Sequence, residues 1–366
     1  MRRRAGDTVE IPAHIEQAIG DAVARHLQTG LGDRGLLLTA DGLETASIEA
    51  ARRGRALLPR IIARCYPSDP QASVALTVEF ESEHAAARIE TALAFGAATA
   101  DVLGRGERNV GPSASSIEVT CAMFNLGIGL VDSLCDEDAA TGEALLALVQ
   151  GQDLAAASQA PRERGWLRAE VPPALAEDPA AAFTVAIIEA FFETLHDSYP
   201  DDAWLTLRRG VGTQLCAALA AEQQSVVRSP EETTREQLIE CSRLTSVLPF
   251  QIIEALVCGA ETPREPSAGT RLGEAMWRID DLVDLCDDAR SGSLNGVLLA
   301  ATPDAGGRGG RELPAALERL LTSTDIACAA AEAAEWLLAG LRLGDSPDDH
   351  PLFLHFVQRY AGITPA

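Results

Sequence analysis

Apolar residues recur at helical spacing along most of the chain, and no stretch shows the strict alternation of a β-strand. Residues 114–136 are apolar on nearly every side until their last turn, which is typical of a helix buried in a core. The pattern predicts further helices at residues 12–29, 43–65, 70–103, 181–197, 201–227, 231–260, 270–290, 312–343 and 350–361. We therefore predict an all-α fold.

The segments between these helices are rich in Gly, Pro and charged residues. They are predicted loops or irregular excursions at residues 30–35, 104–113, 151–181, 261–269 and 301–311. No internal repeat and no shift in composition requires a second domain, and 366 residues are ample for one large core. We predict a flexible N-terminus over residues 1–10 and one helical domain over residues 11–366.

The charge of the chain limits its partners. The formal net charge is -24, so the surface repels the phosphates of nucleic acids and the head groups of anionic membranes. We therefore predict no nucleic-acid partner. All 30 basic residues are Arg. A phosphorylated ligand could be held only by Arg, by metal ions or by backbone N–H groups, because the chain has no Lys ammonium.

The cysteines and the apolar segments indicate where in the cell the protein resides. None of the eight cysteines forms a CxxC pair, and most lie in apolar helical stretches, which is typical of reduced, buried thiols. No apolar run follows the first residues, and no stretch reaches the roughly 18 uncharged apolar residues that a membrane span needs. The sequence thus predicts a cytoplasmic protein without stable membrane insertion.

A first acidic cluster ends the apolar helix at residues 114–136. Asp132 and Asp136 are four residues apart and share one helix face. Two carboxylates on one face at the end of a buried helix repel each other. This arrangement is costly unless a cation or a proton relieves it.

A second acidic cluster lies at residues 280–288. Asp280, Asp284 and Asp288 follow each other at four-residue intervals along one helix face, and Asp281 adds a further carboxylate. Like charges at this spacing destabilise a helix by a few tenths of a kcal/mol per pair. A divalent metal ion would compensate for that cost.

The chemistry of these clusters indicates a magnesium site. Carboxylate oxygens suit Mg²⁺, which binds through one or two carboxylates together with substrate phosphate. Two such clusters facing each other would bracket a diphosphate. Metal-bound diphosphate is a good leaving group, so loss of diphosphate from an allylic carbon would follow. The alternative is that both clusters are solvated surface; a calcium-binding EF-hand fits poorly because its loop Gly is absent.

Two motifs resemble those of the trans-isoprenyl diphosphate synthase and class I terpene cyclase superfamily. MWRIDDLVD at residues 276–284 resembles the second Asp-rich motif, and LVDSLCD at 130–136 resembles the first, with Ser133 in place of its second Asp. Their order and interval are also similar. The resemblance implies an antiparallel helical bundle around a central active-site cavity. It also implies three Mg²⁺ ions with substrate bound, held by Asp132, Asp136, Asp280, Asp281, Asp284 and Asp288.

The same resemblance implies diphosphate ligands. SRLTSVLPFQIIEALVCGAE at residues 242–261 is similar to the synthase segment that precedes an apolar helix, which implies Arg243 and Thr245 as ligands, with Arg235 as a rival. Arg359 and Tyr360 are similar to an Arg-Tyr pair near the C-terminus of cyclases. The implied catalytic set is therefore Asp132, Asp136, Asp280, Asp284, Arg243 and Arg359.

In this architecture the substrate tail would run from Asp132 down its own helix. Gly127 and Gly129 leave room near the top, and Phe124 lies eight residues before Asp132, about 12 Å deeper. A deep pocket favours a substrate of 15 to 20 carbons or longer. The residues that we expect to line the pocket or stabilise cations are Phe124, Gly127, Ile128, Phe250 and Trp277.

One departure from the family separates the alternatives. Chain-elongating synthases hold isopentenyl diphosphate with a GGKRxRP-like segment, whereas residues 53–59 read RGRALLP, with Ala56 and Leu58 at the two Arg positions. The resemblance therefore implies a class I terpene synthase (cyclase), a carbon–oxygen lyase of isoprenoid secondary metabolism, and it permits a homodimer. The alternatives are a prenyl diphosphate synthase or prenyltransferase, and a non-catalytic partner subunit of such an enzyme.

Overall fold

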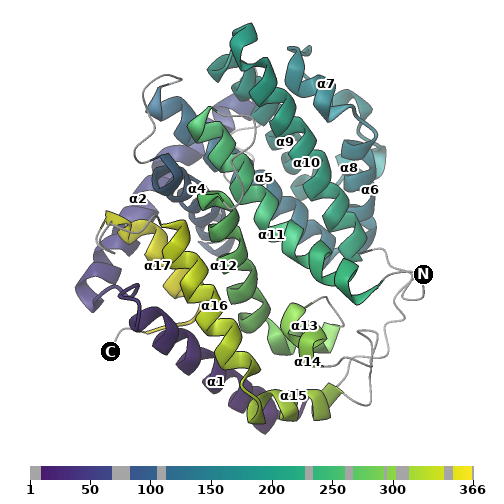
Figure 1. Cartoon of the computed structure of the whole chain (residues 1–366). Coiled ribbons are helices and arrows are strands. Elements are labelled where there is room, and N and C mark those ends of the chain that lie inside the picture. The colour runs from purple at the N-terminus through teal and green to yellow at the C-terminus, as the bar shows by residue number, and fades with distance from the viewer. Residues whose placement is uncertain are drawn as a thin grey trace. The chain divides into compact units, whose positions relative to one another are not determined.

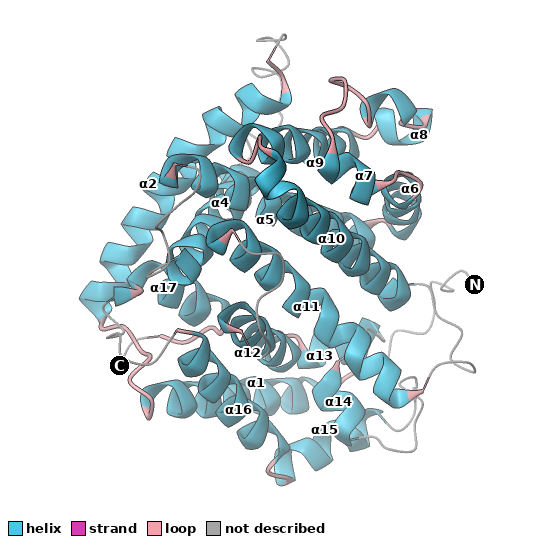
Figure 2. Cartoon of the chain, turned by 45° about the horizontal axis from the view of Figure 1, so that its top comes forward, coloured by secondary structure: helices cyan, strands magenta, loops and turns pink. Residues whose placement is uncertain are grey.

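The fold is all-helical in the part of the chain that the structure describes. The computed structural model describes residues 10–67, 83–104, 113–226, 234–259, 267–291, 295–301, 313–341 and 349–364. No strand occurs over these residues (Figure 2). The prediction of an all-α fold is confirmed.

The helices follow the chain as labelled in Figure 1. The α-helices are α1 (Ala13–Gly32), α2 (Ala40–Cys65), α4 (Glu83–Gly104), α5 (Ala114–Glu137), α6 (Ala139–Gln150), α7 (Leu154–Gln159), α8 (Pro173–Ala176), α9 (Pro179–Ser198), α10 (Leu205–Val226), α11 (Arg235–Cys258), α12 (Ala268–Val283), α13 (Leu285–Ser291), α14 (Gly296–Ala301), α15 (Leu313–Thr322), α16 (Asp325–Gly340) and α17 (Pro351–Tyr360). Two 3₁₀ turns lie at Arg168–Glu170 and Asp202–Trp204.

Two predicted helices are divided in the structure. The helix predicted at 270–290 is interrupted at Asp284, between α12 and α13. The helix predicted at 312–343 is interrupted before Asp325, where the Ser323 hydroxyl accepts a hydrogen bond from the Asp325 N–H. Short polar side chains compete with the helix for backbone groups, which explains this second break. The predicted start of a helix at residue 70 lies outside the described residues.

The chain packs as two compact units. The first comprises Met1–Leu43, Ala221–Leu248 and Pro266–Ala366, and the second comprises Glu44–Ala220 and Pro249–Glu265. Helices α2, α10 and α11 each contribute residues to both units. The prediction of a single domain over residues 11–366 stays a prediction.

In the first unit, α12 packs along α16, and α16 packs along α1 (Figure 1). Small residues allow this close approach: a Cβ on Gly340 would lie 2.6 Å from the Leu272 side chain, and a Cβ on Gly273 would lie 2.6 Å from the Val247 Cα. Overpacking at such positions is destabilising. Helix α12 is thus held on two sides, which fixes the position of its acidic C-terminal end.

In the second unit, α5 packs against α4, α6 and α9. Its middle turns are almost fully buried; Cys121 and Met123 are 0 % exposed. The Asn125 amide donates to the Ala92 carbonyl oxygen (2.9 Å), and a Cβ on Gly96 would lie 2.8 Å from the Cys121 carbonyl oxygen. The near-continuous apolar sequence of α5 therefore reflects contacts on most of its sides.

The thiols are all reduced. All eight cysteines lie in the described part of the chain, and only Cys328, on α16, is exposed there. Burial raises the pKa of the Cys65 thiol to about 12 and that of the Cys286 thiol to about 11. These two thiols therefore stay protonated at neutral pH.

Two described helices are long and apolar enough to cross a membrane by composition alone. They cover Ala114–Cys135 in α5 and Glu236–Cys258 in α11, and more than half of each apolar window is buried within the protein. Core helices of soluble proteins pass the same test, so this is weak evidence for membrane insertion. The predicted cytoplasmic location stays a prediction.

Candidate functional site

The structure brings Asp280 and Asp284 together at the side chain of Tyr360. The Tyr360 hydroxyl donates to Asp280 Oδ1 and lies 3.3 Å from Asp284 Oδ2. The backbone keeps its helical hydrogen bonds across the break, since the Asp284 N–H donates to the Asp280 carbonyl oxygen (2.9 Å). The two carboxylates therefore remain on one helix face, as their spacing predicts.

The chemistry of this group is that of a carboxylate pair beside a phenol. Tyr360 is 40 % exposed, yet desolvation of its hydroxyl, together with the neighbouring Asp280 and Asp284, raises its pKa far above the usual value, so the phenol stays a protonated donor. The two carboxylates are both within reach of one phenol oxygen. Mg²⁺ commonly binds through one or two carboxylates and keeps several waters. Within the described residues no set of three or more His, Cys, Asp or Glu side chains forms a ready metal cluster, so the geometry offers a carboxylate pair.

Asp288 and Asp281 are held by a different residue, Asn295. The Asn295 amide donates to Asp288 Oδ2 (3.0 Å) and to the Asp281 carbonyl oxygen (2.6 Å). Its own oxygen accepts from the Val297 and Leu298 N–H groups (3.1 Å each) and so begins α14. The sequence reasoning missed Asn295, although Asn followed by Gly before an apolar run is a typical helix start.

The Asp281 carboxyl group faces the protein interior. It is 2 % exposed, accepts from the Gly296 N–H (3.1 Å) and lies 3.8 Å from the Arg278 guanidinium. A Cβ on Gly296 would lie 2.7 Å from Asp281 Oδ2, so only Gly fits there. Asp281, a predicted metal ligand, thus contacts the start of α14, whereas Asp280 and Asp284 contact Tyr360.

Asp281 makes stability dependent on pH. Burial, with a contribution from Asp280, raises the pKa of this carboxyl group from 3.8 to about 8. The folded state therefore binds a proton that the unfolded state has lost between about pH 4 and pH 8, so this group makes stability fall as pH rises through that range.

Replacing Asp281 with Asn is therefore expected to raise stability relative to the wild type by roughly 1–2 kcal/mol at pH 5 and by a further few kcal/mol at pH 8. The amide keeps the acceptor for Gly296 and removes the ionisation. Denaturant unfolding in EDTA at both pH values measures this. A difference between the two proteins that does not grow from pH 5 to pH 8 would contradict the assignment.

Arg243 lies in an ion-pair network between α11 and α12. Its guanidinium donates to Glu240 (2.8 Å) and to Glu274 (3.3 Å), and Glu274 also pairs with Arg271 (2.9 Å). The Thr245 hydroxyl donates to the Ser242 carbonyl oxygen within α11. Arg243 would have to exchange one of these carboxylates to bind diphosphate.

The remaining predicted diphosphate ligands lie at helix ends. Arg235 is the first residue of α11, and its side chain lies outside the described residues. Arg359 is exposed in the last turn of α17 and directly precedes Tyr360. The chain therefore carries the Arg359 guanidinium next in sequence to the residue that contacts Asp280 and Asp284.

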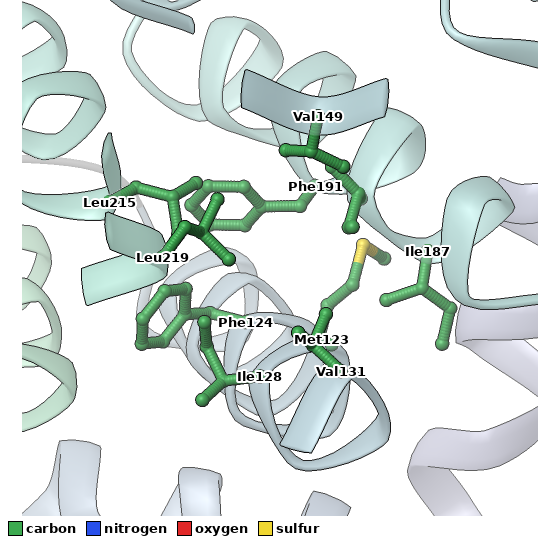
Figure 3. A pocket seen from close by; sticks show the side chains of 11 residues that line it. Met123, Phe124, Ile128, Val131, Val149, Ile187, Phe191, Leu215 and Leu219 are labelled. Carbon is green, nitrogen blue, oxygen red and sulfur yellow. The ribbon is translucent and has the colours of Figure 1, made fainter. Parts of the chain in front are cut away.

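The second unit contains an apolar pocket between α5, α6, α9 and α10, with an empty volume of about 330 Å³ that includes space open to solvent (Figure 3). The predicted residues Phe124, Gly127 and Ile128 line it. The other lining residues, all apolar, are Met123, Val131, Val149, Ile187, Ile188, Phe191, Leu215 and Leu219. The rings of Phe124 and Phe191 are 5.5 Å apart and form one part of the wall.

Phe250 and Trp277 are not among the pocket-lining residues. The Phe250 ring packs edge-on against Phe95, with 6.1 Å between ring centroids. The Trp277 indole N–H donates to the Ser242 hydroxyl (2.9 Å), and the Arg278 guanidinium lies 4.1 Å from the Trp277 ring centre. Both aromatic residues therefore pack against neighbouring side chains at other places in the fold.

Asp132 continues the pocket face of α5. Ile128 and Phe124 lie four and eight residues before it, so the three side chains share one helix face, and Asp132 is exposed at its end. Arg88 of α4 donates to the Ser133 hydroxyl (3.1 Å). The sequence reasoning missed this cation because a single Arg in an Ala-rich helix gives no signal.

The first acidic cluster is only partly described. Asp136 lies in the last turn of α5, but its side chain is outside the described residues. Asp132 belongs to the second unit, and Asp280 and Asp284 belong to the first. That the two clusters face each other stays a prediction.

The segment at residues 53–59 lies in α2. Arg53 is bound by two carboxylates, Asp101 (2.6 Å) and Glu118 (2.7 Å). Arg55 is largely exposed and lies 3.4 Å from Glu90. The charge of Arg53, the less exposed of the two, is thus already neutralised by carboxylates. This disfavours a second diphosphate site in this segment.

Comparison of the chain with protein families, with characterised proteins and with solved structures finds no significant match.

Proposed function

We propose that this protein is a magnesium-dependent class I terpene synthase with an isoprenoid-synthase type of fold, which ionises an allylic prenyl diphosphate. The observation that carries the proposal is the contact of Tyr360 with both Asp280 and Asp284. The family resemblance pairs an acidic motif with a C-terminal Arg-Tyr dipeptide. The described contacts bring Tyr360 of this dipeptide to Asp284 and Asp280, which lie 76 and 80 positions before it in the sequence.

The acidic pair is the binding site for the cofactor in this proposal. Asp280 and Asp284 would hold Mg²⁺. A bound Mg²⁺ would neutralise the charge that develops on the departing diphosphate. Arg359, exposed beside Tyr360, and Arg243 would donate charge-assisted hydrogen bonds to the same group. The allylic C–O bond breaks, and its electron pair leaves with the diphosphate.

The apolar pocket of the second unit supports the proposal because its lining would suit the hydrocarbon chain of a prenyl substrate. Its lining residues are all apolar, as the walls of small-molecule sites mostly are. None of these lining residues carries a hydroxyl, thiol, amine or carboxylate, and Phe124 and Phe191 would offer aromatic faces that stabilise a cation. Excluding water from such a site prevents early capture of the cation. The reaction then ends when the cation loses a proton or takes up one water.

Measuring diphosphate release with Mg²⁺ from geranyl, farnesyl and geranylgeranyl diphosphates, each with and without isopentenyl diphosphate, tests the proposal. We expect release without isopentenyl diphosphate, together with an extractable hydrocarbon or alcohol, and loss of both in EDTA. Release that requires isopentenyl diphosphate would instead identify a prenyl diphosphate synthase. No release under any condition would contradict an enzymatic role and favour a partner subunit.

A further inference from the structure

The Tyr360 hydroxyl contacts one oxygen of each carboxylate in the Asp280–Asp284 pair. It donates to Asp280 Oδ1 and lies 3.3 Å from Asp284 Oδ2. A hydroxyl presents the positive end of its O–H bond to a carboxylate. A cation bound to the same oxygens would meet that hydrogen, so both cannot hold the pair with full strength.

Helix α17, which carries Tyr360, has two buried side-chain atoms that make no hydrogen bond within the described residues. Gln358 accepts a hydrogen bond from the Leu38 N–H (3.1 Å), which ties α17 to the segment before α2. Within the described residues, however, Gln358 Nε2 and His355 Nδ1 have no hydrogen-bond partner, although both side chains are at least 97 % buried. Buried polar atoms without partners cost free energy. A shift of α17 would therefore break no hydrogen bond at these two atoms.

We propose that Tyr360 and a divalent cation compete for the Asp280–Asp284 pair, so that cation binding releases the last turn of α17. This inference rests on the metal site of the proposed function. Tyr360 then acts as a latch, a side chain that closes the acidic pair until a cation replaces it. The same event frees the turn that carries Arg359.

Calorimetric titration with MgCl₂, without substrate, tests the latch in the wild type, in Tyr360→Phe and in a control, Tyr66→Phe. Phe keeps the ring and removes only the competing hydroxyl. We expect Tyr360→Phe to bind Mg²⁺ roughly three- to tenfold more tightly, since a hydrogen bond to a charged group is lost only from the metal-free state. Tyr66→Phe, which changes a ring beside Arg168 in the other unit, should bind as the wild type does.

Hydrogen–deuterium exchange of residues 356–363 is the second measurement. Mg²⁺ should speed exchange there in the wild type, and Tyr360→Phe should already exchange fast without it. Equal or weaker Mg²⁺ binding by Tyr360→Phe, or slower exchange in wild type with Mg²⁺, would overturn the latch and leave the proposed function standing. If the wild type binds no Mg²⁺ at all, the latch and the metal site of the proposed function both fail.

Discussion

Replacing Glu189 with Ala is expected to lower the free energy of unfolding by roughly 3–5 kcal/mol. Glu189 lies in α9 and is 0 % exposed. Its carboxylate accepts from the N–H groups of Gly165 (2.9 Å) and Leu167 (3.0 Å), and from the Arg168 guanidinium (2.6 Å). Alanine would leave the buried Leu167 N–H and the partly buried Gly165 and Arg168 donors without their acceptor, which is more costly than losing an exposed ion pair.

The neighbouring Glu193 provides the matched control on the same helix. It lies one turn further along α9, and its nearest cation is Arg164 at 3.7 Å, whose side chain is 66 % exposed. Glu193→Ala should therefore cost less than about 1 kcal/mol. Denaturant unfolding of both variants measures the difference. If the two substitutions lower the free energy of unfolding equally, the hydrogen bonds of Glu189 do not stabilise the second unit more than an exposed ion pair would.

Replacing Asp280 or Asp284 with Asn is expected to slow Mg²⁺-dependent diphosphate release by roughly 10²–10⁴-fold. A bound metal stabilises the transition state by several kcal/mol, and each 1.36 kcal/mol changes the rate tenfold. Asn has nearly the same shape as Asp and keeps an acceptor for the Tyr360 hydroxyl. It lacks the negative charge that holds the cation. The substitution therefore tests the charge of the acidic pair and leaves its packing in place.

Asp287 is the control for this second prediction. It lies in the same acidic run but is exposed, and it pairs with Arg290 in the next turn. Asp287→Asn should change the rate of release by less than about twofold. Mg²⁺ affinity should fall in the Asp280 and Asp284 variants and stay constant in the control. An equal loss of activity in all three variants would mean that general surface charge, rather than the pair, is what matters.

The sequence predicted the helical class because helix formation leaves a local periodic signal. The long apolar run of α5 predicted a buried helix, and Cys121 and Met123 are indeed fully buried. The four-residue spacing of Asp280 and Asp284 predicted a shared face, which the helical hydrogen bond between them preserves. These features depend on neighbours in sequence, so they can be read from it.

Contacts between distant helices could not be predicted from periodicity. An apolar residue is expected to be buried, but the pattern does not say which neighbour buries it. Phe250 and Trp277 were therefore expected at the pocket, whereas they pack elsewhere, and Phe191 and Leu215 line it instead. The contact of Tyr360 with Asp280 and Asp284 was not predicted, because nothing local to α17 points to Asp280 and the resemblance implied Tyr360 only as a diphosphate ligand.

The exposed thiol of Cys328 offers a site for attaching a probe to the first unit. Of the eight cysteines it alone is exposed, while burial keeps thiols such as Cys65 and Cys286 protonated and slow to react. A maleimide dye or spin label should therefore attach to Cys328 faster than to the partly buried Cys216, Cys258 and Cys286. That site lies on α16, which packs along α12. A label there would report on movement of α16 against α12, the helix that ends in the acidic pair.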